Sequence, residues 1–342
     1  EAEAGEIVCI SGIDKLNISD TLCHPDQPEA MAPLSVDEPT ISMTFQVNDS
    51  PFAGREGKYI TTRQIKDRLE RELLYNVALR VEQGDTPDKY KVSGRGELHL
   101  SVLIESMRRE GFELAVSRPE VILHEEDGVF KEPIESLVVD CDEKHQGSVM
   151  EELGQRRAEL QDMLPDGRGR VRLQFLIPTR GLIGFRSMFL SMTSGSGVMT
   201  HVFDHYGDYK DTDLASRSRG VLVSMVKGKV LGFSLFNLQD RGKLFVGPNV
   251  ETYEGMIIGL HSRENDLAVN PIKGKQLTNV RASGTDENIV LTPPINHTLE
   301  QAMEFIAEDE LVEVTPENIR LRKKLLTENE RKRHGRDATA RK

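Results

Sequence analysis

The sequence contains no tryptophan, few aromatic residues and only three cysteines among its 342 residues. Cys9, Cys23 and Cys141 lie far apart and are odd in number, which excludes a disulfide framework and a paired-cysteine metal site. No run of eighteen apolar residues occurs, so we expect no membrane-spanning helix. The opening residues, EAEAGEIVCI, lack the basic stretch and apolar core of a signal peptide. Together these absences predict a cytoplasmic protein with no membrane contact.

The sequence also lacks the loops with which enzymes hold nucleotides. A P-loop requires Ser or Thr directly after its Gly-Lys pair, because that hydroxyl binds magnesium. The Gly-Lys pairs that begin at Gly57, Gly228, Gly242 and Gly274 are followed by Tyr, Val, Leu and Gln. There is no GxGxxG motif either. We therefore expect no catalytic residue, cofactor or metal in this chain.

One glycine pair, Gly94 and Gly96, precedes a predicted helix and could cradle a phosphate at the helix N-terminus. The next residue is Glu97, which places a carboxylate where the phosphate would bind. We favour a tight corner between a strand and a helix, in which glycine relieves steric crowding and the helix dipole stabilises Glu97.

Charge is unevenly distributed along the chain. The net charge is −12, yet the stretch from Glu317 to Lys342 carries ten Lys or Arg against four Asp or Glu. The formal balance is thus +6 at this end and −18 over the first 316 residues. An acidic body with a basic end is compatible with binding nucleic acid through one patch. A solvated terminal helix explains the same run equally well.

The hydrophobic pattern predicts an α+β multidomain protein whose centre is two ferredoxin-like β-α-β-β-α-β units. In the first unit, residues 38–125, strands are expected around Ile41–Val47, Val77–Val81, Tyr90–Val92 and Phe112–Val116. Leu100, Leu103, Ile104 and Met107 form one helical stripe, and Gly111 is placed to end that helix. The second unit, residues 126–207, repeats the order with a helix predicted over residues 179–195.

Residues 208–342 have a different sequence pattern, in which strand-like segments are separated by glycine-rich loops. This pattern predicts a β-rich domain ending in a basic helix. Strands are expected across residues 220–236 and 253–262, with one short amphipathic piece near Leu238. Thr298 and Gln301 form a capping-box pattern before a helix. The segment ELVEVTPENIRLRK predicts two strands across a Thr-Pro turn, and a last helix is expected to begin at Thr327.

Three other readings of function stay open from the residues alone. His201 and His205 are four apart on a predicted strand, so we expect them to share a face, but zinc would need a third ligand. We favour two polar residues at a strand end. The segment GLIGFR, Gly181 to Arg186, is similar to the phosphate loop of acylphosphatases, although it follows the third strand of its unit rather than the first. A pair of ferredoxin-like units could also bind a small metabolite.

Several longer sequence segments resemble parts of translational GTPases. Residues 4–22, AGEIVCISGIDKLNISDTL, resemble the last strands of their second-domain β-barrel, which predicts a barrel remnant over residues 1–37. Residues 93–114 are similar to the third domain of elongation factor G, and residues 181–206 to its fifth domain. Three further segments resemble the C-terminal domain of the BipA/TypA family: LQDRGKLFVGP, GLHSRENDLAVNP and KQLTNVRASGTDE. The sequence thus resembles the C-terminal portion of that family, without the GTP-binding domain.

This resemblance implies a ribosome-binding module of a cytoplasmic bacterial GTPase that serves growth under stress or cold and large-subunit assembly. GTP and magnesium would bind in the parent's GTP-binding domain. The partners implied are ribosomal RNA and the tRNA acceptor end near the ribosomal A site, and a monomer is expected. Cations that cluster beside glycines are the predicted RNA contacts, because backbone and cation can approach a phosphate together. They are Lys227, Lys229, Arg241, Lys243, His261, Arg263, Lys273, Lys275, Arg281, Arg320, Arg322, Lys323 and Lys324.

Overall fold

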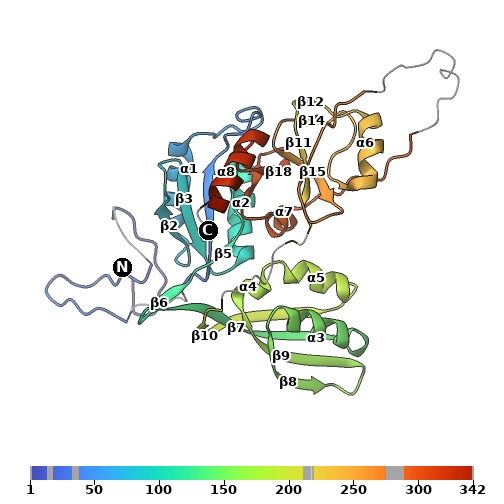
Figure 1. Ribbon diagram of the computed structural model, residues 1–342. Coiled ribbons are helices and arrows are strands. Elements are labelled where there is room, and N and C mark those ends of the chain that lie inside the picture. Colours follow the sequence, from blue (N-terminus) through green and yellow to red (C-terminus); the bar gives the residue numbers. More distant parts are fainter. Residues whose placement is uncertain are drawn as a thin grey trace, which may run out of the picture.

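The computed structural model of the chain describes residues 2–13, 18–32, 38–210, 217, 219–274 and 289–340 (Figure 1). Helices and strands alternate within it, and the architecture is mixed α+β. Among the described residues, no helix has the length and apolar character needed to cross a membrane.

The first unit has the predicted order β-α-β-β-α-β. Its elements are β1 (Ile41–Val47), α1 (Thr62–Leu73), β2 (Arg80–Gln83), β3 (Lys89–Gly94), α2 (Glu97–Glu110) and β4 (Leu114–Val116). The strands pair antiparallel in the order β4-β1-β3-β2. The second strand begins three residues later than expected, after Leu79, which is nevertheless buried.

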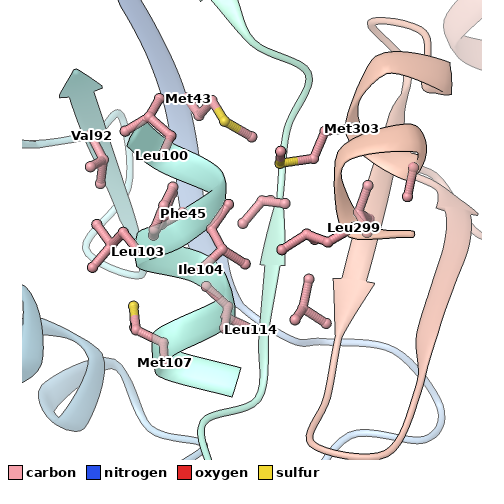
Figure 2. Close-up of a cluster of buried hydrophobic side chains, with 14 of the residues drawn as sticks. Met43, Phe45, Val92, Leu100, Leu103, Ile104, Met107, Leu114, Leu299 and Met303 are labelled. Atoms are coloured by element: carbon pink, nitrogen blue, oxygen red, sulfur yellow. The ribbon is translucent and has the colours of Figure 1, made fainter. Parts of the chain in front are cut away.

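Helix α2 packs on this sheet through the predicted stripe. Figure 2 shows Leu100, Leu103, Ile104 and Met107 in one cluster with side chains of β1, β3 and β4, and all four are buried. The helix ends at Gly111, whose φ of +98° is left-handed and favours glycine there. Gly94 is required at the other end, because a Cβ on it would lie 2.8 Å from the His99 ring. The Gly94–Gly96 segment is therefore a strand-to-helix corner.

The second unit repeats the order on a separate sheet. It contains β7 (Val129–Asp142), α3 (Gln146–Gln155), β8 (Glu159–Pro165), β9 (Arg170–Pro178), α4 (Thr179–Leu182), α5 (Phe185–Met192) and β10 (Val198–Asp208), in the strand order β10-β7-β9-β8. Strand β6 (His124–Glu126) pairs with β7. The single helix predicted over residues 179–195 is broken, because Gly184 takes a left-handed φ of +71° between α4 and α5.

The third unit contains strands and short helices. They are β11 (Val221–Ser224), β12 (Gly228–Lys229), α6 (Gly232–Leu238), a 3-10 turn (η2, Gln239–Arg241), β13 (Gly242–Leu244), β14 (Glu251–Thr252), β15 (Met256–His261), β16 (Leu267–Val269), α7 (Leu299–Phe305), β17 (Glu310–Val314), β18 (Ile319–Lys323) and α8 (Glu328–Ala340). The strand predicted across residues 220–236 gives way to α6, because Leu235 and Leu238 bury one helical face.

The first and third units share one continuous sheet. Strand β17 pairs with β4, with Val312 opposite Val116, so the strand order runs β16-β11-β15-β18-β17-β4-β1-β3-β2. Strand β5 (Glu120–Val121) also pairs with β1. Helix α7 lies beside α2, and Leu299 and Met303 join the same core (Figure 2). We call this joined body the long-sheet body; the second unit stands below it in Figure 1.

The barrel strands predicted over residues 1–37 are absent from the described part of that segment, where an isolated bridge between His24 and Gln27 is found. Ile7 and Ile10 are fully or largely exposed there. Barrel strands need neighbouring strands to complete their hydrogen bonds, and no described strand lies beside this segment. The domain boundaries predicted at residues 37, 125 and 207 stay predictions.

Candidate nucleic-acid interface

The structure separates the predicted cations into a surface group and a buried group. The exposed side chains are Lys227, Lys229, Arg241, Lys243, Arg263, Lys273 and Lys324. The buried or largely buried ones are His261, Arg320, Arg322 and Lys323. Lys275 and Arg281 lie outside the described residues.

A groove of about 620 Å³ lies in the third unit between α6 and the segment that follows β16. Arg241 and Lys273 both line it, although they are distant in sequence. Asn237 and Asn270 add amide groups, and Phe233 adds an aromatic wall. Cations, amides and an aromatic face are the groups that bind phosphates and bases in nucleic-acid interfaces.

Hydrogen bonds hold the two walls of this groove together. The Ser234 hydroxyl on α6 donates to the Asn270 carbonyl at 2.7 Å, and the Leu231 N–H donates to the Pro271 carbonyl at 3.0 Å. The Asn270 side chain accepts from the Ile272 N–H at 3.0 Å, which turns the chain just before Lys273. Lys273 is thereby fixed beside α6.

Arg241 and Arg263 come to the same end of the β13–β15 pair. Gly242 lies opposite His261, and the Ser262 N–H donates to the Arg241 carbonyl at 2.9 Å. The strands approach so closely that a Cβ on Gly242 would lie 1.9 Å from the Leu260 carbonyl oxygen, so only glycine fits. Lys243 follows on the same strand and is exposed. Arg241, Lys243 and Arg263 therefore lie on this strand pair or next to its ends, and Arg241 also lines the groove.

None of the seven exposed cations forms an ion pair within the part of the chain that the structure describes. Most other arginines of the long-sheet body do, as Arg68 does with Glu110 and Arg217 with Glu310. A cation without an internal partner keeps its charge available for a phosphate. The charges of these seven side chains are thus not neutralised by an internal ion pair among the described residues.

The buried group cannot act in this way. Strand β18 lies between β15 and β17 inside the sheet. Lys323 is 2% exposed and contacts Asp266 at 2.6 Å, Asp309 at 2.8 Å and Glu310 at 2.9 Å. Burial opposes its charge, but Glu310 and the two aspartates outweigh burial and raise the pKa of Lys323. A buried charge requires such partners.

Arg320 and Arg322 share this arrangement. Arg322 is fully buried and pairs with Asp49, and Arg320 pairs with Glu56 and with Glu313, the latter at 2.9 Å. His261 is also buried, and its Nδ1–H donates to the Asn265 carbonyl at 2.5 Å. The prediction that these side chains and Lys323 contact RNA does not fit the structure, because the side chains are buried or largely buried and the arginines and Lys323 form internal ion pairs.

A signal for this burial was present in the sequence. Once the β17–β18 hairpin is registered, Glu310 lies opposite Lys323 and Glu313 opposite Arg320. Opposite charges facing across a hairpin indicate internal pairing. Conversely, the exposed cations Lys332, Arg333 and Arg336 on α8 were absent from the predicted set, although the basic terminal run contains them.

The two histidines considered as zinc ligands are separated in the structure. A register shift between Phe203 and His205 places His201 opposite Leu137 and His205 opposite Ile134, so the two imidazoles lie on opposite faces rather than one. Within the described residues, no group of three His, Cys, Asp or Glu side chains could hold a metal.

The loop from Gly181 to Arg186 is also occupied internally. Arg156 donates to the carbonyls of Gly181 and Ile183, both at 2.9 Å. The Gly184 N–H faces the Glu97 carboxyl and stabilises its charge. The Glu97 side chain thus takes the amide that an acylphosphatase loop would offer to a phosphate, and nothing in the described fold supports that alternative.

Comparisons with known protein families match two parts of the chain. Residues 219–328 match the family described as the TypA/BipA C-terminal domain. Residues 129–217 match the elongation factor G C-terminus. A solved structure from Thermus thermophilus is 14% identical to this chain, with a TM-score of 0.32. The match covers 55% of this chain and 44% of that chain.

Two curated relatives match over nearly the whole chain. The large ribosomal subunit assembly factor BipA of Haemophilus influenzae is 61% identical over 99% of this chain and 55% of that protein. The protein of the same name from Escherichia coli K12 is 62% identical over 98% of this chain and 55% of that protein. The chain thus spans about half the length of the curated relatives it matches. By these matches the chain belongs to the BipA/TypA family.

Proposed function

We propose that this chain is a non-catalytic module that binds the large ribosomal subunit through RNA. The observation that carries the proposal is the groove between α6 and Gly274, which places Arg241 and Lys273 together at the surface. The name of the relatives, large ribosomal subunit assembly factor, supports the choice of partner.

The charge distribution supports the same proposal. The chain is acidic overall, so most of its surface repels RNA, and binding must come from local cations. The groove, the β13 edge with Lys243 and Arg263, and the exposed face of α8 supply them. Such a distribution favours one docking orientation, because every other face is repelled.

The finer assignments rest on the resemblance to elongation factor G and are part of the proposal. In it, the first and second units are ferredoxin-like and act as levers and wedges toward the ribosomal A site. The third unit contacts ribosomal RNA and the tRNA acceptor end. The chain acts as a monomer in the cytoplasm and holds no cofactor, while the parent protein binds GTP and magnesium in its own GTP-binding domain and serves growth under stress or cold.

Sedimentation of the chain with purified large subunits tests the proposal. Replacing Arg241 and Lys273 by Glu should weaken binding and flatten the dependence of log affinity on log salt by about 1.4 to 1.8, if each cation contacts one phosphate. The matched control replaces Lys66 and Arg71, which are exposed on α1, by Glu. It makes the same change of net charge and should leave the slope unchanged. Equal losses in both variants would show that only net charge matters and would refute the groove.

A further inference from the structure

The joint between the second unit and the long-sheet body contains two carboxyl groups that no catalytic or RNA-binding role explains. Glu97 begins α2, and Glu304 lies on α7, so both belong to the long-sheet body. They line a groove of about 300 Å³ together with Arg186, Ser187 and Leu190 of α5 in the second unit. Figure 1 shows α4 and α5 as the elements of the second unit that face α7 and α2.

Contacts across this joint depend on the carboxyl groups. The Ser187 hydroxyl donates to Glu304 Oε1 at 3.1 Å, which links α5 to α7. The Gly184 N–H faces Glu97, and the left-handed φ of Gly184 turns this amide outward from the α4–α5 break. Oε1 of Glu97 is enclosed and has no hydrogen-bond partner among the described residues. An ionised carboxylate enclosed in this way loses its hydration without full compensation.

We propose that this joint is a proton-dependent latch, which holds the second unit against the long-sheet body while Glu97 is neutral and releases it when Glu97 is charged. Release restores water to the carboxylate of Glu97, whose burial beside α4 and α5 is then lost. The latch would set the orientation of the second unit, independently of where the third unit binds RNA.

The charged groups around the joint favour this behaviour. Burial, and after it the nearby Glu304, raise the pKa of Glu97 to about 7, while Gly184, His201 and Arg156 oppose the shift. Burial also raises the pKa of Glu304, with Glu300 acting in the same direction and Ser187 and Arg156 against it. His201 is engaged by Glu135 at 2.5 Å, and Arg186 on α5 faces His201.

The direction with pH follows from these shifts. A released Glu97 should ionise near its ordinary pKa of 4.5, whereas the docked one ionises near 7. Docking is therefore fully favoured below about pH 4.5 and is lost progressively as the pH rises to about 7. Each unit by which the docked and released pKa values of Glu97 differ changes the docking equilibrium constant tenfold. We therefore expect this constant to fall at least about tenfold between pH 5.5 and pH 8.

Single-molecule fluorescence transfer on the full chain tests the latch. Dyes insensitive to pH are attached at Lys66→Cys on α1 and Gln161→Cys on β8, after Cys9→Ser and Cys23→Ser remove the exposed thiols. The chain should give one narrow transfer population at pH 5.5 and a second, separated population at pH 8. Glu97→Gln, which mimics the neutral carboxyl, should stay in the docked population at both pH values.

Glu300→Gln is the control, because Glu300 is exposed on the same helix as Glu304 and lines the same groove. It should leave the release at pH 8 largely intact. If Glu97→Gln fails to fold, as judged by circular dichroism, Glu304→Gln takes its place and should reduce the released population at pH 8. Transfer that is identical at the two pH values in the parent chain, or release that persists at pH 8 in the glutamine variant, would overturn the latch.

Discussion

Lys323 is a buried cation whose ion pairs stabilise the centre of the long-sheet body. Its ammonium contacts Asp266, just before β16, and the consecutive residues Asp309 and Glu310 at the start of β17. Glu310 is fully buried and is also bound by Arg217 at 2.8 Å. Without Lys323, three carboxylates would face one another with reduced compensation. The residue therefore stabilises the fold rather than a bound phosphate.

We predict that Lys323→Met lowers the free energy of unfolding by about 3 kcal/mol, because breaking a buried ion pair leaves uncompensated charge. The neighbouring Lys324→Met should change it by less than about 0.5 kcal/mol, since Lys324 is exposed. Urea unfolding followed by circular dichroism measures both values. Two equal and small changes would mean that the lysine contacts contribute nothing to stability.

Single residues also show which structural features could be predicted from the sequence and which could not. Periodicity identified the buried stripe of α2, because Leu100 and Ile104 must face a sheet wherever the helix lies. Charge alone could not distinguish Lys323 from Lys324, which are adjacent and chemically identical. What separates them is the position of β18 between two strands, and that depends on tertiary pairing. For this reason the RNA-contact prediction does not fit Arg320, Arg322 and Lys323, which all lie on β18.

At the scale of elements, α7 depends on its first turn. The Thr298 hydroxyl accepts from the Gln301 N–H at 3.3 Å, and the Gln301 side chain accepts from the Thr298 N–H at 3.1 Å, as the capping-box pattern predicted. The helix has only seven residues, so it has little intrinsic stability and needs both this cap and its buried side chains. It also carries Glu304 to the joint.

We predict that Thr298→Ala costs about 1 kcal/mol of unfolding free energy, the usual effect of losing an N-cap. Thr298→Ser keeps the hydroxyl and should restore most of the loss. Thermal unfolding of the three proteins at one pH compares them directly. An alanine variant as stable as the serine variant would show that packing alone holds α7.

Most elements could be predicted from the sequence, and the exceptions have identifiable causes. The β-α-β-β-α-β order of both units and the β17–β18 hairpin follow from alternation and turn residues. Gly184 broke a predicted helix because its left-handed φ could not be inferred from an apolar stripe. The segment HEEDGVFKEP forms the β6–β7 hairpin around Asp127 and Gly128, which both take positive φ values.

The whole molecule behaves as two bodies rather than three, because a sheet crosses from the first unit to the third. Val312 and Val116 pair at this crossing and are both buried. Asn48 adds a polar link, since its amide donates to Glu113 at 2.7 Å and to Glu313 at 3.2 Å. No pattern along the chain could predict this pairing, which joins strands about 200 residues apart.

We predict that Val312→Ala, which removes buried methyl groups at a cost of about 2 kcal/mol, accelerates hydrogen exchange in β1 and β15 alike. Exchange in β7 and β9 of the second unit should be unchanged. The matched change Val139→Ala, at a fully buried position of β7, should do the reverse. Mass spectrometry of exchanged peptides resolves these strands. Acceleration restricted to β15 and β17 would mean that the units unfold separately despite the shared sheet.

The groove of the third unit is the proposed contact with RNA of the large ribosomal subunit. A photoreactive amino acid at Asn237, which is exposed and lines the groove, tests it most directly when the chain is irradiated with large subunits. We predict crosslinks from this position to large-subunit RNA that are lost when Arg241 and Lys273 are replaced by Glu. The same probe at Gln161 on the distant strand β8 should crosslink weakly and independently of those substitutions. Equal RNA crosslinking from both positions, or none from Asn237, would contradict the claim.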